Sequence, residues 1–313
     1  MLDLANVANH ALLDEAIAGL GQTQKAISPK WFYDARGSAL FEEITRLDEY
    51  YPFRTEIAIL RARAAEIAAA VAPGTALVEL GSGASVKTRI LLQGQGRLTR
   101  YVPLDISAEF LAQTAASIAS DFPGLAVDPV VADFMAPIAL PRHIADVEKL
   151  LFFPGSTIGN LDPAQARDLL LRLRGIPRVS GFVLGVDLVK DTGVLLRAYD
   201  DARGVTAAFN LNLLARLNRD AAANFDLAAF RHEARWNAEH SRIEMHLVSR
   251  SEQIVVLGRH EVRFRAGESL HTENSHKFTR EGLAVLLQET GWGLEEYWTD
   301  PAENFAVLLL RPG

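Results

Sequence analysis

The stretch ALVELGSGASVKTRILL, residues 76–92, decides the fold class of this 313-residue chain. It opens with a short apolar run, Ala76–Leu80, which predicts a buried strand. The turn Gly81-Ser82-Gly83 follows, and then a predicted helix over Val86–Leu92. A strand, a glycine turn and a helix in this order are typical of a parallel, doubly wound α/β sheet.

The same alternation of short apolar runs and helical patterns continues toward the C-terminus. Further strands are predicted over Tyr101–Leu104, Ala126–Ala132, Lys149–Phe153 and Gly181–Val189, and helices over Ala108–Ser120 and Pro163–Arg174. A helix ending at Thr290 and two strands, about 294–298 and 305–310, would complete the sheet. This alternation predicts an α/β domain with a mostly parallel sheet.

After Asp191 the alternation breaks, which predicts a second domain built from interleaved segments. Two helices (about 193–201 and 204–219) precede the strand-like runs 242–249, 252–257 and 262–264. The N-terminal part predicts helices over 9–20, 39–47 and 56–71. We therefore expect one domain formed by 56–190 with 277–313, and a discontinuous α+β domain formed by 1–55 with 191–276.

Composition narrows the function. The net charge of −7 does not suit a nucleic-acid binder, whose phosphate contacts need clustered Lys and Arg. The chain has no cysteine, so disulfides, zinc–thiolate sites and cysteine nucleophiles are excluded. No apolar run reaches the ~18–20 residues of a membrane span, and the N-terminus MLDLANVANH lacks a signal-peptide pattern. We expect a cytoplasmic protein with no membrane or nucleic-acid partner, and by default a monomer.

Polar residues at the ends of three successive predicted strands point to the ligand. The dinucleotide pattern G-x-G-x-x-G would need glycine where the chain has Val86, which disfavours a nicotinamide or flavin site and hence an oxidoreductase. S-adenosylmethionine has no pyrophosphate and needs only an open glycine turn. An acid after the second strand, Asp105, can accept both ribose hydroxyls. Asp133 and Phe134, after the third, suit the amine and the flat ring of adenine.

The eight histidines do not predict a metal site. No H-E-x-x-H is present. His232 and His240 are eight residues apart, and His271 and His276 are five apart, so neither pair has the i, i+4 spacing of ligands on one helix face. We expect no catalytic metal.

Six segments together resemble the histidine Nα-methyltransferases of ergothioneine biosynthesis. They are KWFYDARGSALFEEITRLDEYYPFRTE (30–56), VELGSGASVKTRILL (78–92), PLDIS (103–107), FPGSTIGNL (153–161), AYDDARGVTAAFNLNLLARLN (198–218) and TENSHKF (272–278). A sister group with the same cofactor motifs methylates the amine of a tryptophan-derived precursor. The resemblance implies a Rossmann-like class I methyltransferase domain that binds S-adenosylmethionine, with a second, substrate-binding domain.

The resemblance also implies roles for particular residues. The cofactor would be held by Gly81, Lys87, Asp105, Asp133 and Phe134. The substrate would be held by a second set. Asn160 and Tyr199 would bind the substrate carboxylate. Glu273 and Ser275 would contact the imidazole, and Met245 would line the imidazole side of the pocket. Tyr33 and Tyr50 would line the amine side. His276, beside Lys277, is a departure from the expected pattern that bears on fine specificity.

Methyl transfer to an amine is an in-line displacement, so the protein has to align the reacting atoms and keep the amine neutral. Tyr33 is the expected catalytic residue: it would orient the amine and help its proton leave. Three rounds would convert L-histidine into its trimethyl betaine, hercynine. The alternatives are an N-methyltransferase of a tryptophan-like amine and a non-catalytic module that binds S-adenosylmethionine.

Overall fold

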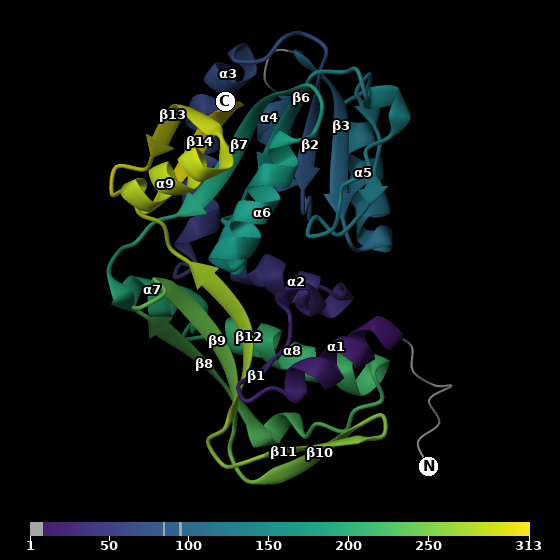
Figure 1. Ribbon diagram of the computed structural model, residues 1–313, viewed down its shortest axis with the longest axis vertical. Coiled ribbons are helices and arrows are strands. Elements are labelled where there is room, and N and C mark those ends of the chain that lie inside the picture. The colour runs from purple at the N-terminus through teal and green to yellow at the C-terminus, as the bar shows by residue number, and fades with distance from the viewer. Residues whose placement is uncertain (1–8, 84, 94–95) are drawn as a thin grey trace. The chain divides into compact units, whose positions relative to one another are not determined.

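In the computed structural model, which describes residues 9–83, 85–93 and 96–313, the first predicted strand is β2 (Thr75–Leu80). Its residues are all buried. It pairs in parallel with β3 (Leu98–Asp105) on one side and β6 (Lys149–Phe153) on the other (Figure 1). An apolar run without alternation therefore became a strand covered on both faces, as parallel sheets require.

The order of the strands reverses beside β2. The sheet has the order β13-β14-β7-β6-β2-β3-β4, with β5 also paired to β3. The chain runs outward from β2 to β3, β4 and β5, and then returns to β6 on the other side of β2. Ligands of such sheets bind at the carboxyl ends of the strands where the order reverses. The remaining strands are β4 (Ala126–Val127), β5 (Val130–Val131), β7 (Val179–Asp187), β13 (Trp292–Thr299) and β14 (Phe305–Pro312).

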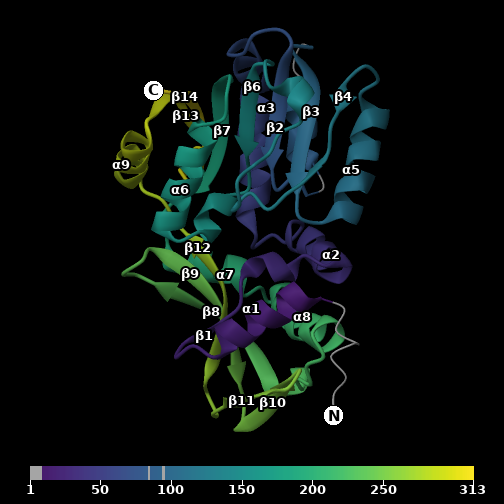
Figure 2. The same cartoon turned by 45° about the vertical axis from the view of Figure 1, so that its right-hand side comes forward.

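Helices cover both faces of this sheet (Figure 2). On β6, Leu151 and Phe153 belong to one apolar cluster with α6 (Pro163–Arg174) and α9 (Arg280–Thr290). Leu150 and Phe152 belong to the opposite cluster, with the other three helices. Those are α3 (Tyr51–Ala69), α4 (Val86–Leu92) and α5 (Ala108–Asp121). The two-residue alternation of strand side chains thus builds two cores, one on each face.

The bounds predicted from the sequence agree closely with most of these elements, and two predictions differ from the structure. The single strand expected over 126–132 is two short strands, since Asp128-Pro129 interrupts the pairing with β3. Proline has no N–H to give to a strand ladder. Helix α3 begins at Tyr51, five residues before the expected start. The residue that follows Gly83 in the turn, Ala84, lies outside the described residues.

The chain folds into two compact units, each built from two separate segments. Unit 1 is Met1–Tyr51 with Lys190–Ser275, and unit 2, which holds the parallel sheet, is Pro52–Val189 with His276–Gly313. The sequence analysis placed the three junctions after residues 55, 190 and 276.

Unit 1 is an α+β unit organised around a long helix, α8 (Val205–Asp220). Leu213, Leu214 and Leu217 of α8 are fully buried in an apolar cluster with both helices and strands of the unit. The other helices are α1 (His10–Leu20), α2 (Ala35–Ile44), α7 (Thr192–Tyr199) and the short 3-10 turns η2 (Pro29–Phe32) and η5 (Leu227–Ala229).

One sheet of unit 1 has the order β1-β12-β9-β8, and β10 with β11 forms a separate hairpin. The strands are β1 (Lys25–Ala26), β8 (Phe230–Asn237), β9 (Arg242–Ser249), β10 (Gln253–Leu257), β11 (His260–Phe264) and β12 (Ser269–His276).

Three of these strands were not predicted: the two-residue β1, and β8 and β12, whose sequences are rich in charged and polar residues. β12 reads SLHTENSH and β8 reads FRHEARWN. β8 is nevertheless paired with β9 along its whole length. Phe230, Ala234 and Trp236 lie at alternate positions of β8 and pack against the unit 1 core, and pairing with β9 completes the strand.

Helix α2 starts four residues earlier than expected. The Asp34 side chain caps it by accepting a hydrogen bond from Gly37 N at 2.7 Å. Gly37 is required there, since a Cβ at this position would lie 1.8 Å from the carbonyl oxygen of Phe32.

A fully buried ion pair lies where the chain crosses between the units, on the unit 2 side. Lys277 Nζ is 2.8 Å from Asp187 Oδ2, and the two side chains are 0% and 1% exposed. Phe278 N also donates to Asp187 O (2.9 Å), and Val189 N donates to Phe278 O (3.0 Å). The end of β7 and the segment after β12 are therefore joined by backbone hydrogen bonds and by a buried ion pair.

Removing one partner of this pair should be costly, because it leaves an uncompensated charge in the core. We predict that Lys277→Met lowers the free energy of unfolding by about 3–5 kcal/mol. Urea unfolding followed by circular dichroism measures this. The matched control is Arg63→Met, which breaks an exposed pair with Glu66 (side chains 44% and 50% exposed) and should cost less than about 1 kcal/mol. Equal losses in the two variants would contradict the prediction.

Candidate functional site

The glycine turn after β2 is open and left-handed. Gly81 has φ +66° and Gly83 has φ +47°, a region that disfavours residues with a Cβ. A Cβ on Gly81 would lie 3.7 Å from the ring of Phe134, so this residue of the expected adenine site lies next to the turn. Gly83 N donates to Asp105 Oδ2 at 3.3 Å. The turn therefore contacts both the β3 end and the segment after β5.

The two acids expected to bind the cofactor each accept a hydrogen bond from the backbone N–H two residues later. Asp105 ends β3, and its Oδ1 accepts from Ser107 N at 3.0 Å. Asp133 lies two residues after β5, and its Oδ1 accepts from Met135 N at 2.8 Å. Phe134 packs edge-on against Phe153, with ring centroids 5.2 Å apart. The structure thus brings the cofactor candidates to the carboxyl ends of neighbouring parallel strands.

Lys87 is paired with a buried residue that the sequence analysis did not single out. Its Nζ is 2.5 Å from Glu56 Oε2, and the Glu56 side chain is 1% exposed. Glu56 also accepts from Gly155 N, which follows β6, at 3.0 and 2.9 Å. A Cβ on Gly185 of β7 would lie only 2.1 Å from Glu56 Oε1, so the carboxylate lies directly over that strand. The Glu56 carboxylate thus links α3, α4 and the ends of two strands beside the reversal of strand order.

Asn160 also belongs to unit 2. It closes the short 3-10 turn η4 (Thr157–Asn160), which starts at Ser156 with φ +57°. Ser156 Oγ accepts from Asp187 N at 2.9 Å. A Cβ on Gly159 would lie 2.8 Å from the carbonyl oxygen of His276. The turn that carries Asn160 is thereby fastened to the same segment that holds the Lys277–Asp187 pair.

The expected aromatic residues of unit 1 form a continuous row. The Tyr33 ring lies edge-on to Phe41 (centroids 5.7 Å apart), Phe41 to Tyr50 (6.2 Å) and Tyr50 to Tyr199 (6.1 Å). Tyr33 and Tyr50 are half-buried at the margin of the unit 1 core, and Tyr199 is inside it. Edge-to-face pairs of this kind are favourable and hold the rings in defined orientations.

The row ends at the strand that carries the TENS motif. Tyr199 OH and Ser275 Oγ are 2.6 Å apart, and both groups are buried. Glu273 is two positions before Ser275 on β12, so the two side chains share a side of the strand. Met245, on neighbouring β9, is buried in the same core as Tyr199, and its carbonyl oxygen accepts from Thr272 Oγ1 at 3.0 Å. Contacts therefore link Tyr33, Tyr50, Tyr199 and Ser275 in sequence, and the other two candidates, Glu273 and Met245, lie on the neighbouring strands β12 and β9.

Sequence reasoning missed a histidine that holds Tyr199. His232 Nε2 donates to Tyr199 O at 2.8 Å, and Asn210 Nδ2 donates to His232 Nδ1 at 2.9 Å. These partners define a neutral imidazole, and burial lowers the pKa of His232 accordingly. No local spacing signals this role, since α8, β8 and α7 meet only in the fold.

The site candidates thus fall into two groups. Unit 2 contains Gly81, Lys87, Asp105, Asp133, Phe134 and Asn160, and unit 1 contains Tyr33, Tyr50, Tyr199, Met245, Glu273 and Ser275. The two residues expected to share the substrate carboxylate, Asn160 and Tyr199, belong to different units.

Comparison with known proteins identifies the family. A family model described as "Histidine-specific methyltransferase, SAM-dependent" matches residues 12–312. The chain belongs to this family. The family membership and the sheet order confirm the predicted fold, an α/β class I methyltransferase with a Rossmann-like sheet. The protein is accordingly an S-adenosylmethionine-dependent methyltransferase.

Three relatives show how far the similarity extends. The chain is 48% identical to a histidine N-alpha-methyltransferase of Mycolicibacterium smegmatis, over 97% of this chain and 96% of the relative. It is 44% identical to the enzyme of the same name from Mycobacterium tuberculosis, over 97% and 98%. A 4-dimethylallyltryptophan N-methyltransferase of Trichophyton verrucosum is 29% identical, over 89% and 88%. Among the described residues, no helix has the length and apolarity needed to cross a bilayer.

A second buried acid of this family member, Glu79, lies on β2 just before the glycine turn. Its Oε2 accepts from Thr88 Oγ1 at 2.6 Å and from the Tyr101 hydroxyl, which also contacts Ser85 Oγ at 2.8 Å. Burial raises the pKa of Glu79 from 4.5 to about 8, although the two hydrogen bonds act in the opposite direction. The folded protein therefore keeps a proton on Glu79 that the unfolded chain releases at lower pH.

The free energy of unfolding should reflect this difference. Because the folded state binds one more proton between pH 4.5 and about 8, the contribution of Glu79 becomes steadily less favourable as the pH rises through this window. We predict that Glu79→Gln gains stability relative to the wild type as the pH is raised from about 5 to about 8. Urea titrations at several pH values measure the trend.

The exposed Glu66, on α3, provides the matched control, and Glu66→Gln should not reproduce the trend. If wild type and Glu79→Gln change in parallel with pH, Glu79 is not the proton-binding group.

Proposed function

We propose that this methyltransferase transfers methyl groups from S-adenosylmethionine to the α-amino group of L-histidine. Three successive rounds would give the betaine hercynine, the first step of ergothioneine biosynthesis. The observation that carries the proposal is the row of residues that ends in the buried Tyr199–Ser275 hydrogen bond beside Glu273, in a chain that belongs to the histidine-specific family. The roles given below to single residues are part of the proposal.

The residues of unit 2 fit the cofactor. A Cβ on the left-handed Gly83 would meet no described atom within 4 Å, so the turn is open there, and Asp105 still has acceptor capacity for two ribose hydroxyls. Asp133 and Phe134 would bind the amine and the face of the adenine. Lys87 has three donors, so it can hold Glu56 and a ligand carboxylate together. When bound, S-adenosylmethionine supplies a methyl group already activated on a positively charged sulfur.

The residues of unit 1 suit an imidazole. The Glu273 carboxylate would accept from one ring nitrogen, and the Ser275 hydroxyl would serve the other, in the orientation set by Tyr199. Met245 would pack on the carbon side of the ring. An amino acid without these nitrogens would leave buried polar groups unpaired, at a cost of about 1–3 kcal/mol each.

The half-buried tyrosines suit an amine that loses its N–H donors as it is methylated. Tyr33 would orient the neutral amine and pass its proton toward solvent, and Tyr50 would face the other side. Aromatic faces continue to attract a trimethylated cation that can no longer donate hydrogen bonds. Asn160 would donate its amide N–H to the substrate carboxylate, with Tyr199 as the second partner.

The proposed roles can be separated by binding measurements. We predict that Glu273→Ala weakens L-histidine binding at least about tenfold, from the loss of a charge-assisted hydrogen bond of about 1.5–3 kcal/mol, and leaves S-adenosylmethionine binding unchanged. The matched variant Asp105→Ala should weaken cofactor binding. Isothermal titration calorimetry measures both ligands on both variants. Loss of both ligands in Glu273→Ala would mean that the residue is structural.

A second measurement tests the product and the substrate class. Purified protein with excess S-adenosylmethionine should convert L-histidine to the trimethylated product by mass spectrometry, and should leave tryptophan and its derivatives largely unmodified. A reaction that stops at the monomethyl product rejects trimethylation. Preferential methylation of a tryptophan-like amine supports the alternative of a tryptophan-type N-methyltransferase. No transfer to any amine supports a non-catalytic binding module.

The same proposal includes the setting in which the enzyme works. We propose that it acts as a monomer in the cytoplasm on a small-molecule substrate, and that methyl transfer itself needs no metal ion, because the donor is already activated.

A further inference from the structure

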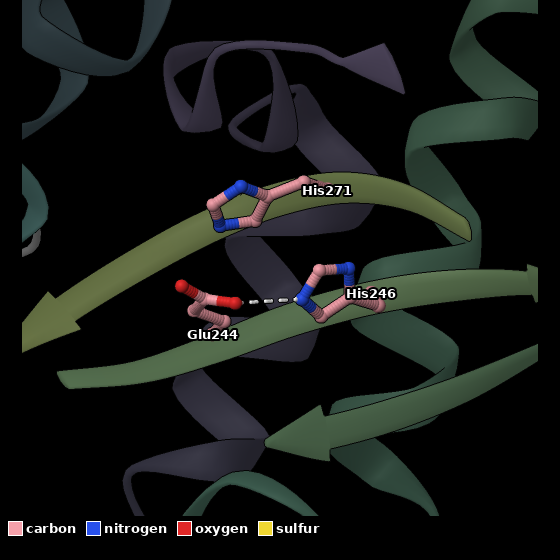
Figure 3. A group of neighbouring side chains, drawn as sticks. All are labelled: Glu244, His246 and His271. Carbon is pink, nitrogen blue, oxygen red and sulfur yellow. Dashed lines mark hydrogen bonds and ion pairs between the residues drawn. The ribbon is translucent and has the colours of Figure 1, made fainter. Parts of the chain in front are cut away.

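Three side chains with metal-binding atoms meet on the sheet of unit 1. Glu244 and His246 lie two positions apart on β9, so they share a face of the strand. The neighbouring strand β12 contributes His271 (Figure 3). One ligand atom from each residue lies within 4.8 Å of the other two. We propose that this Glu–His–His group binds a divalent transition metal ion, with Zn²⁺ as the expected species, using none of the residues proposed to bind the cofactor or the substrate.

The donor set matches that class of ion. Two imidazoles and one carboxylate suit Zn²⁺ and its neighbours in the transition series, whereas Mg²⁺ and Ca²⁺ prefer oxygen ligands alone. Three protein ligands leave a further position for water. The search for i, i+4 histidine pairs in the sequence missed this group, because its members come from two strands.

The distances need only a small adjustment. With metal–ligand bonds of about 2.0–2.1 Å, the ligand atoms of a tetrahedral site lie about 3.3 Å apart. His246 Nε2 and Glu244 Oε2 are already 3.1 Å apart. The two imidazole rings are stacked, with centroids 4.8 Å apart and planes 18° from parallel. Binding would therefore require the half-buried His271 side chain to rotate until one of its nitrogens faces the other two ligand atoms.

Neighbouring groups already orient the ligands. Glu244 Oε1 accepts from Arg242 Nε (2.8 Å), Arg242 Nη2 (2.7 Å) and Asn237 Nδ2 (2.9 Å), which leaves Oε2 directed at His246. His271 Nε2 donates to Glu273 O at 3.1 Å, a bond that a rotation of the ring toward the ion would exchange for the metal contact. Metal sites typically fix their carboxylate and histidine ligands by such outer hydrogen bonds.

His246 is the most deeply buried of the three ligands, and its second ring nitrogen is unpaired among the described residues. Its side chain is 4% exposed, and its Nδ1 is buried with no hydrogen-bond partner in the described part of the chain. A buried nitrogen without a partner is unfavourable, and native proteins generally avoid it.

Charged side chains around the three ligands should weaken the binding of a metal ion. Arg235 lies opposite Glu244 in the β8–β9 ladder and is paired with Glu233, which also binds Arg231. With Arg242 included, three guanidinium groups face two carboxylates. The net positive charge opposes a cation, so we expect weaker binding than at a closed four-ligand structural zinc site.

Calorimetry tests the site directly. Full-length protein without an affinity tag is stripped with a chelator, transferred to a histidine-free buffer, because free histidine binds the same ions, and titrated with ZnCl₂. We expect one ion per chain. Glu244→Gln, which nearly preserves side-chain shape, and His271→Ala should each lower the affinity at least about tenfold. Circular dichroism verifies that both variants are folded.

The matched control is His260→Ala, which removes an exposed histidine of the same unit, on β11, and should bind Zn²⁺ like the wild type. Titration with Co²⁺ gives a second readout, since ligand-field absorption reports nitrogen coordination, and this signal should be lost in His271→Ala. Absence of binding by the wild type, or equal binding by wild type, Glu244→Gln and His271→Ala, overturns the proposal. Because the readout is ion binding, that result leaves the proposed methyl transfer untouched.

Discussion

Parallel pairing places the carboxyl ends of β2, β3, β5 and β6 at one edge of the unit 2 sheet, and the arrangement of cofactor candidates depends on this constraint. Because successive strands point the same way, the residue that follows each strand is delivered to that edge. The position of Asp105 follows from the register of β3 against β2, and the position of Asp133 follows from the short pairing of β5 with β3. The strand order reverses beside β2, which is where open α/β sheets bind their ligands.

Unit 2 stabilises three buried carboxyl groups in three different ways. Glu56 is ionically paired with Lys87 and receives a backbone N–H. Asp187 is paired with a fully buried lysine. Glu79 has hydroxyl partners and burial raises its pKa to about 8, so it is mostly neutral at physiological pH. Each solution avoids an isolated charge in the core, which would cost several kcal/mol.

In unit 1, strands rich in polar residues carry side chains that we propose for substrate binding. The Tyr199 backbone is held by His232 and its hydroxyl by Ser275, so the tyrosine is fixed at both ends. β12 carries Ser275, Glu273 and His271 within five consecutive residues, and this strand therefore belongs to the proposed substrate site and to the proposed metal site. A strand with this many polar side chains is stable because it is paired along the sheet and its Leu270 and Thr272 are buried.

The sequence alone determined the α/β class and most helices and strands of unit 2, because apolar runs bounded by glycine and proline specify buried parallel strands locally. It also indicated the acids at the strand ends, since their positions follow from strand length. It did not predict β8 and β12, whose many charged and polar residues obscure the strand pattern until neighbouring strands pair with them. Nor could it pair Lys87 with Glu56, Tyr199 with His232, or His271 with Glu244. These partners lie far apart in the chain, and only the packing of separate elements brings them together.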